Sequence, residues 1–384
     1  MNKSLFVVSA LLVAFLLAAC APTSPAPRTQ AAPAKAAWET EWEKVLAAGK
    51  AEGQVVLGAT AQSPTTVSEL TKGFSSTFGI QLQVVTASNG PELTQKISTQ
   101  RRAGIYSYDV LVTGTTTPLT SLKPAGVLDH PMDTVLIYPD LTDPKIISQT
   151  WYQGKLWWVD ADHSVIASLM FPDTPLAINT DLVKPGEIKS WRDLLDPKWK
   201  GKMILNDPTV AGISGSSFVP MMLQGQVAGP DFLSELAKQE PIIMRDQRLM
   251  LDWLVHGKNP IVIAPTTSTV IELARTGAPI QAITPSEGVW VGSAAGSWAV
   301  FNNRPDPNAT KVFVNWVLSK EGQNVYARAY GGQSARLDVP TDYLAPEQTR
   351  QPGGKYWIKE QEASLLQGPA NMEKAKAIFG SLMK

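Results

Sequence analysis

Short apolar runs alternate with amphipathic runs over the first part of the chain. Residues 54–60 (QVVLGAT), 80–87 (IQLQVVTA) and 108–114 (YDVLVTG) have the length and β-branched content of strands. Between them, residues 65–79 and 88–104 carry apolar side chains at helical spacing and end at a glycine. This strand–helix–strand order predicts an α/β fold with a mostly parallel, doubly wound sheet.

Small polar residues and glycines follow each predicted strand. The same holds later in the chain, after the apolar runs 202–208 (KMILNDP) and 260–265 (PIVIAP). In open α/β sheets, ligands bind beyond the carboxyl ends of the strands, where free helix N–H groups favour anionic oxygens. The candidate ligand-binding residues at these five strand ends are Gln62, Ser63, Ser88, Asn89, Thr113, Gly114, Thr115, Gly215, Ser216, Thr266, Thr267 and Ser268.

Helix capping is the competing interpretation of these residues. Ser, Thr and Asn are preferred N-caps in any helix, and Thr269 with Glu272 matches a capping box. Capping alone therefore explains any single strand end. Five such ends, divided between two halves of the chain, favour ligand binding.

Two long apolar segments connect the two halves. Residues 164–183 run through two prolines, and residues 283–303 return with many glycines and small residues. Two crossings between two α/β lobes form a hinge, with an interlobe cleft that closes over a ligand. We expect lobe 1 to comprise residues 38–174 and 284–318, lobe 2 to comprise residues 175–283, and residues 319–384 to form a helical segment that braces the lobes.

Larger side chains near the expected cleft are further candidates for ligand contact. Trp290 lies in the return crossing beside glycines, where an aromatic ring can form one wall of the cleft. Arg245 follows an apolar run and Arg336 follows a double glycine, and either guanidinium suits a bidentate pair with carboxylate or phosphate. A surface position is the more common role of such arginines. Tyr326 and Tyr330 share a helical face, and we expect both to pack against the core.

Residues 1–37 differ in composition from the rest of the chain. Lys3 precedes an apolar stretch, and the sequence LLAAC ends at Cys20, the single cysteine of the chain. This start resembles a bacterial lipoprotein signal, which implies export, lipid attachment at Cys20 and removal of residues 1–19. An ordinary secretion signal is the alternative. We expect residues 20–37, which are rich in proline and alanine, to form an extended tether to a membrane, facing the periplasm or the cell exterior.

Charge and motif content narrow the possible functions. Lys plus Arg and Asp plus Glu both number 34, so the chain lacks the basic excess that is typical of nucleic-acid binding. The three histidines show no metal-ligand spacing, and we predict neither a metal site nor a cofactor. The loop GISGSS lacks the spacing of a nucleophile elbow, and the glycine-rich loops lack the lysine of a P-loop. The sequence therefore favours a binding protein over an enzyme, and we expect this protein to be a monomer.

Three segments resemble a known family. Residues 42–57 (WEKVLAAGKAEGQVVL), 190–208 (SWRDLLDPKWKGKMILNDP) and 308–323 (NATKVFVNWVLSKEGQ) are similar to extracellular solute-binding proteins of bacterial ABC importers, in the branch usually labelled iron(III)-binding. The resemblance implies a two-lobed periplasmic-binding-protein fold of type II and no catalysis. It also implies a membrane permease and an ATPase as partners, which read the closed, loaded form.

Thr266 and Thr267 change the substrate that the resemblance implies. Ferric-binding members hold the metal with adjacent tyrosines after the same late strand, and these two threonines stand at the matching positions. Neutral hydroxyls suit hydrogen bonds to phosphate, phosphonate, carboxylate or sugar oxygens, so we predict a small polar, anionic organic solute. The alternatives are a ferric-ion carrier with other oxygen ligands, a lipoprotein hydrolase with a carboxylate pair such as Asp160 and Asp162, and a binding protein that feeds a sensor.

Overall fold

The computed structural model describes residues 35–173, 175–184, 186–210, 214–224, 227–229 and 231–383. The chain divides into two compact units, Met1–Ala36 and Ala37–Lys384, and the fold described below is that of the second unit. The predicted signal peptide, the predicted lipidation site Cys20 and most of the predicted tether lie outside the described residues. Within the described ranges, no helix is both long and apolar enough to cross a membrane.

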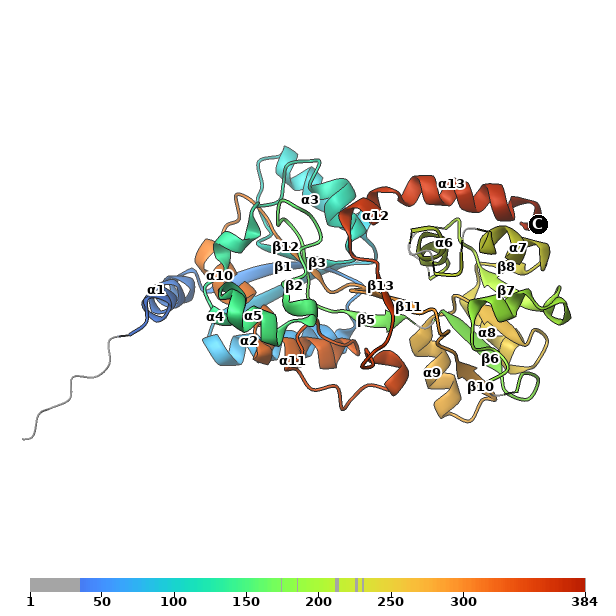
Figure 1. Cartoon of the computed structure of the whole chain (residues 1–384). Helices are drawn as coiled ribbons and strands as arrows, with labels where there is room; N and C mark the ends of the chain where they lie inside the picture. Colours follow the sequence, from blue (N-terminus) through green and yellow to red (C-terminus); the bar gives the residue numbers. More distant parts are fainter. Residues whose placement is uncertain are drawn as a thin grey trace, which may run out of the picture. The chain divides into compact units, whose positions relative to one another are not determined.

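A five-stranded sheet forms the centre of lobe 1 (Figure 1). Its strand order is β2–β1–β3–β12–β4, in which β1, β2 and β3 are parallel and β12 is antiparallel to its two neighbours. The three strands and two helices predicted between residues 54 and 114 are all present. The strands are β1 (Gln54–Thr60), β2 (Gln81–Ala87), β3 (Val110–Thr113), β4 (Ile166–Ala167) and β12 (Ser297–Val300). The helices are α1 (Ala37–Glu52), α2 (Pro64–Phe78), α3 (Gly90–Arg102), α4 (Pro139–Thr142), α5 (Pro144–Thr150), α10 (Pro307–Leu318) and α11 (Lys320–Tyr330).

Capping residues, prolines and a glycine determine where α2 and α3 begin and where α2 ends. Ser63 caps α2 by accepting a hydrogen bond from the Thr66 N–H, and Asn89 caps α3 by accepting one from the Glu92 N–H. A proline stands in the first turn of both helices, where its missing N–H costs no helical hydrogen bond. Helix α2 ends at Gly79, whose φ of 69° is a left-handed conformation that glycine adopts without steric cost.

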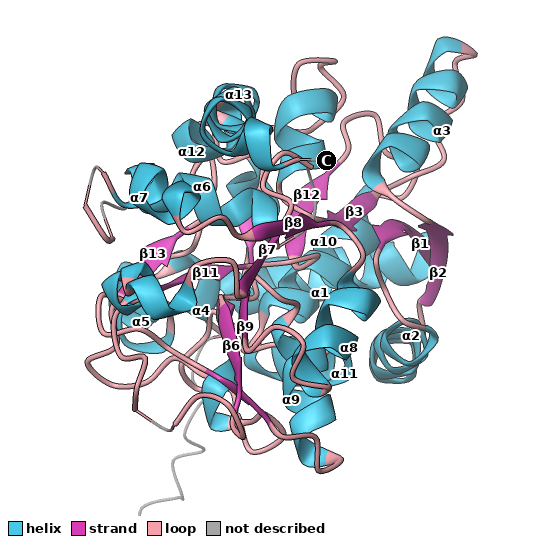
Figure 2. Ribbon diagram, turned by 90° about the vertical axis from the view of Figure 1, so that its right-hand side faces the viewer, coloured by secondary structure: helices cyan, strands magenta, loops and turns pink. Residues whose placement is uncertain are grey.

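A second five-stranded sheet forms the centre of lobe 2. Its strand order is β10–β6–β9–β7–β8, with β7 parallel to β8 and β9, and with β6 antiparallel to β9 and β10. The strands are β6 (Leu176–Asn179), β7 (Met203–Asn206), β8 (Ile242–Met244), β9 (Ile261–Ile263) and β10 (Ile280–Ala282). The helices are α6 (Gly215–Gln224), α7 (Phe232–Lys238), α8 (Gln247–Val255) and α9 (Thr267–Arg275). Figure 2 shows helices on both sides of the strands, as a doubly wound fold requires.

A three-stranded sheet, here named the hinge sheet, joins the two lobes. The two predicted crossings form β5 (Phe171–Asp173) and β11 (Val289–Gly292), which are antiparallel. A third strand, β13 (Tyr356–Ile358), pairs in parallel with β11 and adds a hinge strand that the sequence analysis did not include. Figure 1 shows these strands between the two larger sheets. Because β13 runs in the same direction as β11, the hinge consists of three strands instead of the two predicted crossings.

The chain after Ser319 contacts both lobes in turn. Helix α11 packs on α2 and α10 in lobe 1. After β13 come α12 (Glu362–Leu366) and α13 (Gly368–Phe379), and α13 packs on α6 and α7 in lobe 2. Ala375 and Phe379 of α13 belong to the buried core of lobe 2. Short 3-10 helices lie at Met132–Val135, Tyr152–Gly154, Trp191–Leu195, Pro197–Trp199, Pro346–Gln348 and Gly380–Leu382, and a π-helical turn lies at Pro118–Leu122.

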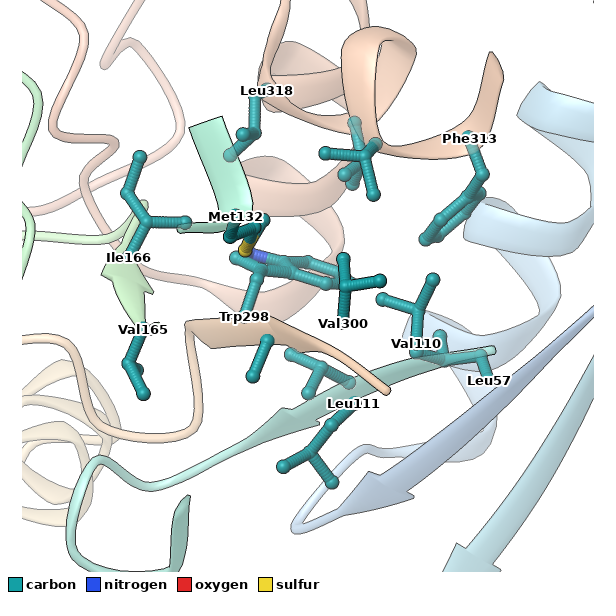
Figure 3. Close-up of a cluster of buried hydrophobic side chains, with 14 of the residues drawn as sticks. Leu57, Val110, Leu111, Met132, Val165, Ile166, Trp298, Val300, Phe313 and Leu318 are labelled. Carbon is teal, nitrogen blue, oxygen red and sulfur yellow. The ribbon is translucent and has the colours of Figure 1, made fainter. Parts of the chain in front are cut away.

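Each lobe has its own apolar core, and the hinge strand β11 contributes to both. In lobe 1, Trp298 and Phe313 pack edge to face, with ring centroids 5.9 Å apart (Figure 3). In lobe 2, Trp191 lies against Phe218 with ring centroids 5.5 Å apart. Along β11, Trp290 is buried in the core of lobe 2, whereas Val291 is buried in the core of lobe 1. Successive side chains of a strand point to opposite faces, so this one strand is anchored in both cores.

Candidate ligand-binding site

A cavity of about 430 Å³ lies where lobe 1, lobe 2 and the hinge sheet meet. Two larger hollows, of about 710 and 720 Å³, are lined by residues of lobe 2 alone, so hinge motion encloses neither of them. Hydroxyl and aromatic side chains are frequent in the lining of the interlobe cavity, which also contains one aspartate and one lysine. The lining residues are Ala61, Ser63, Thr66, Phe171, Pro172, Asp173, Ser214, Thr266, Thr267, Ser268, Trp290, Gly292, Ala294, Tyr330, Gly331, Gln348 and Lys359.

Three of the lining hydroxyls of lobe 2 come from the start of helix α9, and Ser214 before α6 adds a fourth. Thr266, Thr267 and Ser268 all line the cavity, as the sequence analysis expected of ligand-binding residues. Thr266 is the N-cap residue by its backbone geometry, yet its side chain makes no capping hydrogen bond. The capping box expected for Thr269 and Glu272 is therefore wrong, because α9 begins at Thr267. The Thr266 hydroxyl remains available to a ligand.

Lobe 1 contributes Ser63 from the start of α2 and Tyr330 from the end of α11. The Tyr330 hydroxyl accepts a hydrogen bond from the Ala295 N–H at 3.3 Å, and burial raises the pKa of this phenol. Packing was the expectation for both Tyr326 and Tyr330. Tyr326 does pack in the core, because it is fully buried and its hydroxyl donates to the Ala295 carbonyl at 2.8 Å. Packing alone does not describe Tyr330, because this residue also lines the cavity.

Asp173 of the hinge strand β5 connects lobe 2 to the hinge. Its carboxylate accepts hydrogen bonds from the hydroxyl of Thr267 and from the indole Nε1–H of Trp290, the latter at 3.1 Å. The backbone N–H of Thr267 is a further donor to it. Burial raises the pKa of Asp173, whereas these donors and the positive charge of Lys359 lower it. Trp290 itself is only 1% exposed, so it serves as a cavity wall and as a donor to Asp173.

Lys359 brings a positive charge to the cavity from the C-terminal part of the chain. It directly follows strand β13, and its backbone N–H donates to the Val291 carbonyl at 3.0 Å. Over the described residues, no hydrogen bond or ion pair engages its ammonium group. An unpaired ammonium in a partly enclosed site is a strong attractant for an anionic oxygen.

Three alanines at or next to the cavity adopt the left-handed backbone region. Ala61 has φ 53°, Ala264 has φ 59° and Ala294 has φ 45°. Ala61 and Ala294 line the cavity, and Ala264 lies two residues before Thr266. Residues other than glycine rarely adopt this region, and such strain concentrates at functional sites. The backbone around the cavity is therefore held in place by the surrounding fold.

Comparison with known proteins identifies the family. Residues 67–352 match the model of the bacterial extracellular solute-binding protein family. The chain belongs to this family. A Haemophilus influenzae protein described only as uncharacterized is 30% identical over 138 residues, which is 36% of this chain and 39% of that protein. The match thus spans well under half the length of this relative.

Solved structures confirm the two-lobed fold of this solute-binding protein. An ABC transporter structure from Clostridium perfringens has a TM-score of 0.65 and 15% identity, over 86% of this chain and 100% of that chain. Trichodesmium IdiA (FutA), in complex with iron and citrate, has a TM-score of 0.63 and 15% identity, over 86% and 99%. The periplasmic binding protein AfuA of Actinobacillus pleuropneumoniae, with fructose-6-phosphate bound, has a TM-score of 0.55 and 18% identity, over 85% and 99%. The family and these neighbours serve solute transport, which agrees with the prediction that the chain is not an enzyme.

Several candidates in lobe 1 of the solute-binding protein are engaged inside the lobe. The Thr113 hydroxyl is 2.5 Å from the Thr60 hydroxyl, and both are buried. Thr115 is buried against Ser297 and donates to the carboxylate of Glu360. The structure does not bring Thr113, Thr115 or the intervening Gly114 to the lining of the cavity. Gln62 lies next to the lining, where its side-chain N–H groups donate to the Thr60 and Ala295 carbonyls.

Two further pairs of candidates are explained by helix starts. Asn89 caps α3, and the N–H of Ser88 donates to the Glu92 carboxylate at 2.9 Å, so both are structural and away from the cavity. Gly215 begins α6, where an added Cβ would lie 2.4 Å from the Asn206 carbonyl oxygen. Glycine is required there by close packing. Neither Gly215 nor Ser216 lines the cavity, although the preceding Ser214 does.

The two candidate arginines are not brought to the cavity. Arg336 is 2% exposed, and its guanidinium is paired with Asp140 at 2.6 Å and with Asp338 at 2.9 Å. Its expected role as a counter-charge for a ligand is therefore wrong, because two carboxylates already neutralise it within lobe 1. Arg245 has a side chain that is 71% exposed, and its Nε lies 2.7 Å from Asp207. It is a surface ion pair of lobe 2 outside the cavity lining.

Sequence reasoning missed Asp173, Lys359 and Tyr330. Asp173 is the single acidic residue in the apolar stretch 164–180, and a lone carboxylate in a crossing segment was a usable signal. Lys359 had no local signal, because its place in the cavity depends on the pairing of β13 with β11. Across the described residues, no group of three or more His, Cys, Asp or Glu side chains is arranged to hold a metal ion.

Proposed function

We propose that this protein captures a small polar organic solute that carries an anionic oxygen group of the phosphate, phosphonate or carboxylate type. The observation that carries this proposal is the unpaired ammonium of Lys359 in a cavity lined by the neutral hydroxyls of both lobes. Charge-assisted hydrogen bonds to an ammonium are about twice as strong as those between neutral groups. A solute oxyanion therefore satisfies Lys359 better than water does.

Binding by both lobes couples capture to closure of the hinge. Ser63 comes from lobe 1, Thr266 and Ser268 come from lobe 2, and Lys359 comes from the hinge region. A solute that contacts all of them binds the closed form more tightly than the open form. The population shifts toward closure by that difference in affinity. The closed, loaded form is then the state that a permease and its ATPase read.

Delivery to an ABC permease and lipid anchoring at Cys20 complete the proposed role. The family is extracellular, which fits the export signal in residues 1–19. A lipid anchor at Cys20 and a tether that continues to residue 37 would hold the binding unit near the permease. Metabolic labelling with radioactive palmitate tests the anchor, with Cys20→Ser as the control that should lose the label.

Ferric ion is the competing ligand. Two of the structural neighbours are described with iron bound and one with fructose-6-phosphate bound, so the shared fold does not decide between these ligands. Around the cavity, the donors from Thr267 and Trp290 leave the Asp173 carboxylate only about one acceptor position, and burial raises the pKa of Tyr330. Both features disfavour the anionic oxygen donors that Fe(III) prefers. A titration of Fe(III)–citrate against citrate alone tests this, since ferric binding would produce a charge-transfer absorbance.

A ligand screen combined with one charge variant tests the proposed function. The full chain in mild detergent would be screened by thermal shift against phosphate, phosphonates, sugar phosphates, dicarboxylates, thiamine and aromatic acids. A ligand at 100 times its Kd adds about 2.7 kcal/mol to the free energy of unfolding. For any organic anion that binds, Lys359→Gln should weaken binding about 10- to 100-fold, because a hydrogen bond to a charged group contributes about 1.5–3 kcal/mol.

The matched control for that variant is Lys355→Gln. Lys355 is exposed and lies four residues earlier, beside a different hollow lined by residues such as Pro285 and Tyr356. It removes the same charge without touching the cavity, and affinity should stay unchanged. The proposal fails if no organic anion stabilises the protein, or if Lys359→Gln binds the anion as tightly as the unaltered chain.

A further inference from the structure

Two opposite charges line the same cavity without meeting. Asp173 reaches it from β5 and Lys359 from the residue after β13. In the part of the chain that the structure describes, neither side chain forms an ion pair with the other or with any other group. The two charges are nevertheless close enough that Lys359 lowers the pKa of Asp173. An Asp and a Lys in one enclosed site normally neutralise each other, so their separation requires an explanation.

The donors around Asp173 are all neutral. They are the hydroxyl and the backbone N–H of Thr267 and the indole N–H of Trp290. An ionised carboxylate has about four acceptor positions, so about one position of Asp173 remains open, together with its negative charge. A neutral donor satisfies a lone pair but leaves this charge uncompensated. The open position is therefore suited to a cationic donor such as an ammonium group.

The surroundings of Lys359 are equally specific. Its stem passes the backbone of Gly292, where an added Cβ would lie 3.6 Å from Lys359 Cδ. The lysine lies beyond residue 352, where the match to the family model ends. Its ammonium therefore belongs to a part of the chain that the family model does not cover. The lining hydroxyls of Thr266 and Ser268 are neutral and can donate to an oxyanion held by Lys359.

We propose that the captured solute is a small zwitterion, with its carboxylate or phosphonate at Lys359 and its ammonium at Asp173. This inference rests on the proposed function and narrows it to one substrate class. A solute with two anionic ends would place one of them against Asp173, which opposes binding by like-charge repulsion. A purely cationic solute would meet Lys359 in the same way. The cavity volume of about 430 Å³ is near the lower end of the usual range for ligand pockets, which favours a short carbon chain between the charges.

Calorimetric titration of paired ligands tests the inference on the unaltered full chain. Glycine, β-alanine, 4-aminobutyrate and 5-aminopentanoate would be compared with acetate, propionate, butyrate and pentanoate. Aminoalkyl phosphonates would be compared with the matching alkyl phosphonates, which separates the two oxyanions. At least one zwitterion should bind at least about tenfold more tightly than its deaminated partner, as expected for a charge-assisted hydrogen bond. Equal or tighter binding of the deaminated partner in every pair would overturn the inference.

Two substitutions locate the effect. Asp173→Asn should reduce the affinity for the zwitterion at least about tenfold and leave the deaminated partner nearly unchanged, whereas Lys359→Gln should weaken both. In Asp173→Asn, the amide N–H groups can face the Trp290 N–H, which would destabilise the fold. If that variant does not fold, the paired ligands on the unaltered chain decide the test. If another organic anion binds and no zwitterion is preferred, the inference fails and the proposed function stands. If no anion binds at all, both fail.

Discussion

In both lobes a small hydroxyl residue stands between a strand and the helix that follows it, but its side chain has a different role in each lobe. In lobe 1, Ser63 completes its own helix, because its hydroxyl accepts from the Thr66 N–H at 3.0 Å. In lobe 2, Thr266 makes no such bond, and the start of α9 is instead completed by Asp173, 94 residues away, through Thr267. A small hydroxyl at a strand end thus indicates where a helix begins. It does not indicate whether the helix uses that hydroxyl or leaves it for a ligand.

The contact between Thr267 and Asp173 should give the largest stability effect of this comparison. Thr267→Val removes a donor from a buried carboxylate, and leaving a buried acceptor unsatisfied costs about 1–3 kcal/mol. Urea denaturation of the ligand-free protein measures the change. Thr276→Val is the matched control at the exposed end of the same helix, where the hydroxyl bonds only the Leu273 carbonyl. Equal stability of the two variants would show that Asp173 does not depend on Thr267.

Thr266→Tyr tests whether the unused hydroxyl faces the ligand. A tyrosine ring at this position fills part of the cavity, and binding of any ligand found in the screen should weaken at least about tenfold, or ~1.4 kcal/mol. Thr276→Tyr adds the same ring at the far end of α9 and should leave the affinity intact. Calorimetry measures both. Unchanged affinity in Thr266→Tyr would place the ligand away from the start of α9.

Alanine substitution of the two residues that precede the helices should give the smallest effects and separate the lobes directly. Ser63→Ala loses a capping hydrogen bond and should lower the free energy of unfolding by about 0.5–2 kcal/mol. Thr266→Ala loses none, so its cost should stay within about 0.5 kcal/mol. Thermal denaturation without ligand resolves the difference. A cost for Thr266→Ala as large as that for Ser63→Ala would contradict the distinction between the two helix starts.

The parts of the fold that could be predicted from the sequence are those specified by short, continuous segments. The strands around Val56 and Val112 and the helix containing Phe74 were predictable, because their apolar spacing and glycine ends are properties of short segments. The two predicted crossings were recognisable by the same means. Strand β13 was not, because a three-residue strand acquires its identity only by pairing with β11, more than 60 residues earlier.

The candidate site was predictable only in part, for a related reason. Ser63, Thr266, Thr267, Ser268 and Trp290 line the cavity, and each had a local signal at a strand end or in a crossing. Arg336 also had a local signal, but its guanidinium is paired with two carboxylates. Asp140 is distant in sequence, and Asp338 is only two residues away. The importance that we propose for Asp173 and Lys359 depends on the absence of an ion pair with either side chain among the described residues. That property belongs to the tertiary structure.

The third strand of the hinge sheet affects which motions of the two lobes cost least. Three strands side by side resist twist, because twisting one lobe against the other would shear the hydrogen bonds between β5, β11 and β13. Bending across the sheet breaks none of them. Bending is therefore the motion of the two lobes that the hydrogen bonds of the hinge sheet oppose least.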